Sequence, residues 1–167
     1  PHTPFARSVA DAAHAAGKEV MLHLPMASRD TQEPGPGQLD AGMPALEMRA
    51  TLDYDLSTVP HVIGVINHMG SLLTTQPAAM DWLMRELWQR RLFFVDSRTD
   101  AETVAASAAL RVGVPVLERH VFLDDDLTPT AVAAQLDRFE QLARQHGYAL
   151  AIGHPHPVTL AGRPAAV

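Results

Sequence analysis

Histidine, asparagine and aspartate residues follow apolar stretches at five places along the chain. Val20–Leu22 leads into His23, Val62–Ile66 into Asn67 and His68, Leu92–Val95 into Asp96, Val121–Leu123 into Asp124, and Ala149–Ile152 into Gly153 and His154. The carboxyl ends of all strands lie on one face in a parallel α/β fold, so we expect these side chains to gather there. Imidazoles and carboxylates grouped at such a face suit metal-assisted or acid–base chemistry.

The first two histidines are candidate metal ligands. A neutral imidazole at a strand end suits Zn²⁺, although His23 taken alone is more simply explained by a hydrogen bond to a loop carbonyl. His68 can bind metal, and Asn67 can donate to a substrate carbonyl or fix a turn. Gly70, which follows closely, allows a tight approach of the backbone. An ordinary Asn/Gly turn with an incidental histidine explains this stretch equally well.

Polar residues later in the chain are candidates for acid–base catalysis and substrate binding. Asp96 can orient a catalytic histidine or act as a base, but local bonds to the Ser97 or Thr99 amide, or a pair with Arg98, are the simpler explanation. Arg119 and Asp124 flank one short strand and can reach the same face. The Asp124–Asp126 run is most simply solvated charge before a helix.

The histidines of the Gly153–Pro157 segment form a further candidate group. His154 and His156 are two residues apart on an extended segment, where side chains share a side. The pair can chelate a metal, or His154 alone can act as a general acid. A structural Pro-rich turn is the alternative. We treat the remaining histidines as surface or packing residues: His2, His14, His61, His120 and His146.

Strands and helices alternate between these residues, which predicts an α/β fold with a mostly parallel sheet. Helices are expected over about 3–16, 44–56, 77–90, 100–110 and 128–146, with Asp100 and Thr128 as N-caps. An irregular segment, 26–43, contains Pro and Gly residues that cannot continue a helix. We expect a single domain over 1–161 and a tail over 162–167.

Composition excludes several classes of protein. The chain has 167 residues, a net charge of −6 and no cysteine, which leaves no disulfides or thiolate metal sites. No basic patch is present to bind a nucleic-acid backbone. No apolar run approaches the ~20 residues of a membrane helix. The first residue is Pro1, not a natural initiator, so we expect residues to precede it.

Six stretches in order carry a resemblance that spans nearly the whole chain: Gly17–Met26, Gly35–Gly37, Gly64–Ser71, Phe93–Thr99, Val121–Asp124 and Ala151–Pro155. Together they resemble the divergent polysaccharide deacetylase family, a bacterial envelope branch of the carbohydrate deacetylase superfamily. The resemblance implies a distorted seven-stranded (β/α) barrel and a periplasmic domain exported across the inner membrane. Its expected ligands are a divalent metal, most simply zinc, and an envelope polysaccharide or oligosaccharide.

The resemblance also implies roles for individual residues. His23 falls where the superfamily has the first histidine of its metal motif, and Ala27 stands where the second would be. His68 is the natural replacement ligand, an inference from its position. Asp96 and His154 match the late aspartate and the acid histidine of ordinary deacetylases, while Asn67, Arg98, Arg119, Asp124 and His156 are assigned to substrate binding.

The family pattern begins with a strand that ends in an Asp-Asp pair, followed by a helix and a second strand, and this chain enters after them. We therefore expect a barrel without its first strands, a metal site without its acidic half, and no activity from this chain alone. An exposed sheet edge would favour self-association.

Three functions follow from this interpretation. The first is metal-dependent hydrolysis of an N-acetyl or related amide on an envelope polysaccharide. The second is a non-catalytic envelope protein that binds glycan or a murein-hydrolase partner through the same cleft, which the absence of a histidine at Ala27 favours. The third is a metallophosphoesterase on a related barrel.

Overall fold

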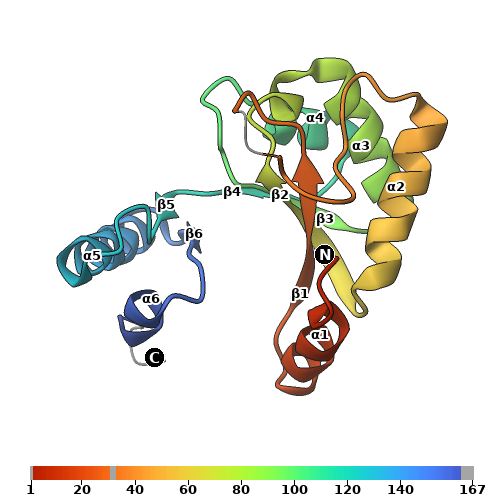
Figure 1. Ribbon diagram of the computed structural model, residues 1–167. Coiled ribbons are helices and arrows are strands. Elements are labelled where there is room, and N and C mark those ends of the chain that lie inside the picture. The colour runs from red at the N-terminus through yellow and green to blue at the C-terminus, as the bar shows by residue number, and fades with distance from the viewer. Residues whose placement is uncertain (1, 31–32, 163–167) are drawn as a thin grey trace. The chain divides into compact units, whose positions relative to one another are not determined.

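The computed structural model describes residues 2–30 and 33–162, in which helices and strands alternate (Figure 1). By its internal contacts the chain divides into two compact units, Pro1–Leu117 and Glu118–Val167. The expectation of one domain over 1–161 stays a prediction. Residues 163–167 of the expected tail lie outside the described residues.

The first unit is built on a four-stranded sheet with the strand order β1-β2-β3-β4. Its strands are β1 (Val20–Met26), β2 (Val62–Met69), β3 (Phe93–Asp96) and β4 (Val116–Glu118). β1 pairs in parallel with β2, and β2 pairs in parallel with β3. The register aligns His23 with Ile66 and Pro25 with His68, so the two histidines lie on neighbouring strands and on the same face of the sheet. The expectation that these strands stop at His23 and at Asn67 is wrong, because β1 continues to Met26 and β2 to Met69.

Helices pack against this sheet. α2 (Ala45–Thr58) contacts β1. α3 (Pro77–Gln89) and α4 (Ala105–Val112) contact β3 and also contact each other. α1 (Ala6–Ala15) lies against β1, and a 3-10 turn, η1 (Leu73–Thr75), leads into α3. The inward stripe expected for α3 is confirmed, because all four of its side chains are fully buried: Met80, Leu83, Met84 and Leu87. They share a core with Leu22, Leu24 and Phe94.

The second unit contains two short parallel strands, β5 (Val121–Phe122) and β6 (Ala151–Ile152), with α5 (Pro129–His146) between them and α6 (Pro157–Ala161) after them. The expected start of α5 is confirmed: the Thr128 side chain accepts a hydrogen bond from the Ala131 N–H. Gly147 ends α5 in the left-handed conformation, with φ 80°, as a C-terminal glycine does.

The sequence-based element boundaries need three corrections. α4 begins at Ala105 rather than at Asp100, and its N-cap residue Val104 makes no side-chain capping bond. Asp100 instead accepts from the Glu102 N–H and from Arg29. Two short helical elements, η1 and α6, were not expected. β5 and β6 are only two residues long each, shorter than the apolar runs suggest.

The α/β class and the parallel sheet are confirmed, but no closed barrel is formed by the strands of residues 2–30 and 33–162. These strands make one sheet of four and one of two. Within the same residues, every helix is too short or too polar to cross a bilayer.

The packing of α3 predicts a strong effect for one core truncation. Leu83→Ala removes a fully buried side chain and should lower the free energy of unfolding by about 2–5 kcal/mol, through lost burial and the cavity left behind. Leu110→Ala on α4 is the matched control, because that side chain is 71% exposed. Urea denaturation of both variants measures the difference. Equal destabilisation would contradict this account of the core.

Candidate functional site

His23 and His68 lie together in the first unit. Their ring centroids are 4.6 Å apart and their planes meet at 77°, an edge-to-face arrangement. His23 is exposed and His68 is half-buried, so both rings are within reach of solvent. Parallel pairing of β1 with β2 produces this approach, because His68 lies two residues beyond Ile66, the partner of His23, and side chains at that spacing share one face of the sheet. The pair can supply two imidazole ligands to a metal ion.

Asn67 joins the ends of β2 and β3. Its side-chain oxygen accepts from the Ser97 N–H at 2.8 Å, and its side-chain nitrogen donates to the Met69 carbonyl at 2.8 Å. The Ser97 hydroxyl donates in turn to the Asn67 carbonyl at 3.0 Å. Asn67 is 1% exposed. Its expected role in substrate binding stays a prediction, while these contacts give it a positioning role beside His68.

Asp96 ends β3 and is fully buried. One carboxylate oxygen accepts from the Arg98 N–H at 2.8 Å, and the other accepts from the Thr103 hydroxyl at 2.9 Å. These bonds resemble the local explanation given for a strand-end aspartate, although the amide involved is that of Arg98. The side chain of Arg98 is exposed at the same strand end. Catalysis by Asp96 and substrate binding by Arg98 stay predictions.

Two residues near these strand ends adopt a left-handed backbone that non-glycine residues rarely take. Met69 has φ 55° and Arg98 has φ 49°. The Met69 carbonyl is fixed by the Asn67 side chain and by the Thr99 hydroxyl, each at 2.8 Å. Such strain persists only where surrounding contacts over-determine it, and it clusters at functional sites.

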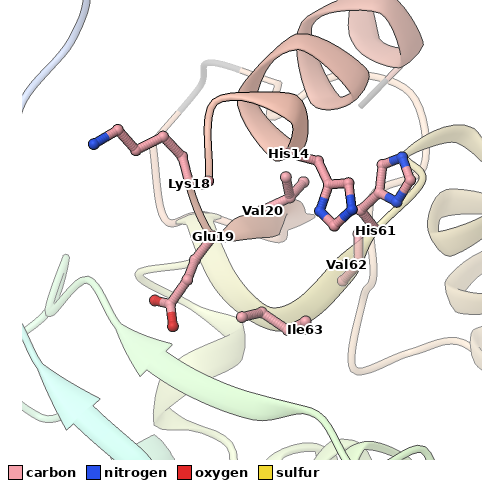
Figure 2. A pocket seen from close by; sticks show the side chains of 8 residues that line it. His14, Lys18, Glu19, Val20, His61, Val62 and Ile63 are labelled. Carbon is pink, nitrogen blue, oxygen red and sulfur yellow. The ribbon is translucent and has the colours of Figure 1, made fainter.

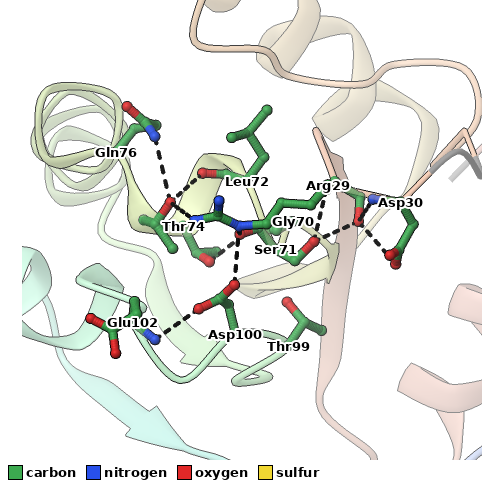
Figure 3. Close-up of polar contacts among 12 residues, drawn as sticks. Arg29, Asp30, Gly70, Ser71, Leu72, Thr74, Gln76, Thr99, Asp100 and Glu102 are labelled. Atoms are coloured by element: carbon green, nitrogen blue, oxygen red, sulfur yellow. Dashed lines mark hydrogen bonds and ion pairs between the residues drawn. The ribbon is translucent and has the colours of Figure 1, made fainter.

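One arginine links the loops that follow β1, β2 and β3 (Figure 3). The Arg29 Nε–H donates to Asp100 at 3.2 Å and to the Ser71 carbonyl at 3.2 Å, and a terminal nitrogen donates to the Thr75 hydroxyl. The Arg29 backbone N–H also donates to the Ser71 hydroxyl, which contacts Ser28 at 2.7 Å. The three loops are therefore held by one hydrogen-bonded network.

In the second unit, Asp124 and His154 form a directly bonded pair. Asp124 Oδ1 lies 3.0 Å from His154 Nδ1, and Oδ2 accepts from the His154 backbone N–H at 2.5 Å. The Thr159 hydroxyl of α6 also donates to Oδ2, at 2.9 Å. Asp124 is 6% exposed, so the expectation that it is solvated charge before a helix is wrong. It is a buried carboxylate that orients an imidazole.

The electrostatics of this pair favour an ionised aspartate. Burial alone would raise the pKa of the Asp124 carboxyl. Hydrogen bonds from the backbone and ring of His154 and from the Thr159 hydroxyl outweigh burial and hold the pKa below its ordinary value. A charged carboxylate beside Nδ1 fixes the ring so that the His154 Nε2 is left for proton transfer.

His156 completes a cluster with this pair. One potential ligand atom from each of Asp124, His154 and His156 lies within 4.8 Å of the other two, and this is the only such group of three found in the described part of the chain. The His154 and His156 ring centroids are 5.9 Å apart, and both side chains are exposed. This cluster is a candidate metal site.

Arg119 and Phe122 lie near the same histidine. The Arg119 guanidinium carbon is 5.2 Å from the Phe122 ring centroid, and the Phe122 and His154 centroids are 5.6 Å apart. The phenyl ring thus contacts both the arginine and the imidazole. A hollow of about 380 Å³ borders His154 on another side, with apolar walls that include Leu136, Phe139 and Leu160. Substrate binding by Arg119 stays a prediction.

A different hollow, of about 450 Å³, lies where β1 and β2 begin, and His14 and His61 line it (Figure 2). Their rings stack at 4.0 Å with an interplanar angle of 4°, and Asp11 contacts His61 at 2.9 Å. Sites of parallel α/β folds lie at the carboxyl ends of strands, whereas this hollow lies at the amino ends. We therefore assign the candidate site to the residues toward the carboxyl ends of the strands and in the loops that follow them.

The structure brings the predicted residues together in two groups. His23, His68, Asn67, Asp96 and Arg98 belong to the first unit, and Arg119, Asp124, His154 and His156 belong to the second. The convergence of His23, His68 and His154 on one pocket stays a prediction. Sequence reasoning assigned Asp124 to substrate binding and did not predict its contact with His154, and it did not name Thr159.

A signal for the Asp124–His154 pair was present in the sequence. The parallel register pairs Phe122 with Ile152, and each polar residue lies two positions after its strand partner. Equal offsets from paired residues place Asp124 and His154 side by side. Thr159 gave no comparable signal, because it lies on the unexpected helix α6.

Comparison with protein families covers nearly the whole chain: the family model described as "Divergent polysaccharide deacetylase" matches residues 1–162. The chain belongs to the divergent polysaccharide deacetylase family. It is 39% identical over 160 residues to "Uncharacterized protein YibQ" of Escherichia coli K12, covering 96% of this chain and 50% of that protein. An "Uncharacterized protein" of Haemophilus influenzae is 38% identical over 161 residues, covering 96% of this chain and 58% of the relative.

A solved structure shares the fold of this family member. The crystal structure of uncharacterized protein ATU2773 from Agrobacterium tumefaciens superposes with a TM-score of 0.92 at 24% identity, covering 96% of this chain and 66% of that one. The likeness shows the fold alone. The chain spans about half the length of the curated relatives it matches.

The hydrogen bonds of Asn67 predict that two substitutions will lower stability by different amounts. Asn67→Ala leaves the buried Ser97 N–H and the Met69 carbonyl without these partners, so it should lower the free energy of unfolding by about 2–5 kcal/mol. Ser97→Ala keeps the N–H bond and loses one hydroxyl bond, so it should cost only about 1 kcal/mol. Urea denaturation tests the order, and the reverse order would contradict the positioning role.

The lowered pKa of Asp124 predicts how stability varies with pH. A carboxyl whose pKa is lower in the folded state stabilises the fold above its unfolded pKa of about 3.9, and this contribution is lost as the pH falls through that value toward the folded pKa. Asp124→Asn should therefore cost about 1–3 kcal/mol at neutral pH. The difference from the natural protein should shrink in acid. Urea denaturation at several pH values measures it, and a pH-independent difference would argue against an ionised Asp124.

Proposed function

We propose that the full-length protein is a metal-dependent hydrolase of the bacterial cell envelope that removes N-acetyl or related groups from a polysaccharide. Membership of the divergent polysaccharide deacetylase family supports the substrate class. The observation that carries the proposal is the approach of the His23 and His68 rings to 4.6 Å on neighbouring strands. The envelope location is part of the proposal and is supported by the resemblance of the sequence to this family.

His23 and His68 would hold the ion, with zinc as the expected metal. Their imidazoles fit two positions of a ligand set that the family completes with a carboxylate. A bound divalent cation would lower the pKa of a water molecule and stabilise negative charge on the carbonyl oxygen of the substrate amide. Asn67 and the strained Met69 backbone would fix the strand end that presents His68.

His154 would supply the proton that the departing amine needs. Its Nδ1 is held by the buried Asp124 carboxylate, so its Nε2 is the nitrogen oriented toward a substrate. In this proposal Asp124 takes the orienting role that the sequence analysis gave to Asp96.

The alternative is a non-catalytic envelope protein that binds glycan or a murein-hydrolase partner. Ala27 favours it, because this residue stands where the superfamily has its second metal histidine, and Ala27 is an apolar residue only 2% exposed. Such a protein would bind glycan without needing the metal.

Two measurements on the full-length protein distinguish the hydrolase from the binding protein: titration with zinc, and assay of acetate released from a substrate. Chito-oligosaccharides and peptidoglycan fragments serve as substrates. His23→Ala and His68→Ala should each abolish zinc-dependent acetate release, and His154→Ala should lower its rate about 10²–10⁴-fold. His146→Ala, an exposed histidine in the last turn of α5, is the control and should leave the rate unchanged.

The outcome that favours the binding protein is equally clear. It is glycan binding that is unchanged by chelator and by His23→Ala, with no acetate released from any fragment.

A further inference from the structure

A second set of possible metal ligands consists of Asp124, His154 and His156. The proposed reaction uses none of them as a metal ligand. We propose that these three side chains form a separate divalent-metal site, for Zn²⁺ or a similar transition ion, and that its occupation removes His154 from acid catalysis. One carboxylate and two imidazoles are a common donor set for zinc, with a fourth position left to water.

The distances fit a metal with small movements. Two zinc bonds of about 2.0–2.1 Å at a tetrahedral angle place their ligand atoms about 3.3 Å apart. Asp124 Oδ1 and His154 Nδ1 are 3.0 Å apart, so an ion can enter between them after a shift of a few tenths of an ångström. His156 has its ligand atom within 4.8 Å of the other two and is exposed, so its ring is free to rotate inward.

The surrounding bonds hold two of these ligands in place. Asp124 Oδ2 is bonded to the His154 backbone N–H and to Thr159, which leaves Oδ1 directed at the cluster. The His156 N–H donates to the His154 carbonyl at 2.8 Å. Pro155 and Pro157 restrict the backbone on both sides of His156. Such preorganisation lowers the entropy lost when a metal binds.

Metal binding and proton donation would compete for the same imidazole. A metal on Nδ1 replaces the Asp124 contact that orients the ring as an acid. Excess zinc should therefore inhibit the enzyme through this cluster. This inhibitory consequence rests on the proposed function, whereas binding of the metal does not.

The binding test uses the full-length protein with His23→Ala and His68→Ala in place, so that the first pair of ligands is absent. After treatment with chelator, calorimetric titration with ZnCl₂ should show one bound ion. Adding His156→Ala should weaken its affinity at least tenfold, as the loss of a direct ligand requires. Adding His146→Ala, the matched histidine control on α5, should change nothing.

A spectroscopic readout identifies the ligands independently. Zinc should shift the imidazole NMR signals of His154 and His156 together and leave those of His146 in place. Absence of zinc binding in the double variant, or an affinity unchanged by His156→Ala, would overturn the proposal.

Activity separates this inference from the function on which its consequence rests. If acetate is released, millimolar zinc should inhibit the natural protein several-fold more than His156→Ala; equal inhibition would refute the inhibitory role. If no acetate is released by any form, the proposed function fails, while the titration still decides whether the second metal site exists.

Discussion

Parallel strand pairing is the constraint on which both groups of candidate residues depend. Residues at equal offsets from paired positions of parallel strands lie beside one another, so polar residues that follow two paired strands meet without further design. Asp124 and His154 meet in this way through the register of β5 and β6. His23 and His68 lie within β1 and β2 instead, where His68 is two residues beyond Ile66, the partner of His23, and so is on the same face of the sheet. A slip of one residue in either pair would turn these side chains to opposite faces.

Hydrogen bonds made by side chains then hold in place the strand ends and loops that the pairing brings together. Asn67 bonds the end of β2 to Ser97 after β3, and Arg29 joins the loops after β1, β2 and β3. Thr159 does the same for the second unit by holding Asp124 from α6. In each case a polar group is satisfied by a neighbouring loop, so the loops are positioned by the same bonds that remove the cost of burial.

The sequence predicted those features of the fold that depend on the spacing of apolar residues and on the residue types at the ends of helices and strands. The stripe of α3 and the Thr128 cap of α5 are confirmed, because each depends on residues close in the chain. The parallel strands are confirmed because helices between successive strands favour parallel pairing. The start of α4 and the burial of Asp124 were not predictable in this way. Asp100 is a residue type that often caps a helix N-terminus, but here its carboxylate accepts a hydrogen bond from Arg29, which is distant in sequence. Asp124 belongs to an acidic run whose first member alone is buried, through contacts with His154 and Thr159.

The left-handed backbones of Met69 and Arg98 have a consequence for evolution of the fold. A residue with a Cβ is less stable in this conformation than glycine by about 1–2 kcal/mol. Glycine at either position would therefore relieve strain and also loosen the chain beside His68 or Asp96. Selection for thermal stability alone should favour glycine at these two sites. Retention of a larger side chain there would indicate selection for accurate placement of His68 and Asp96.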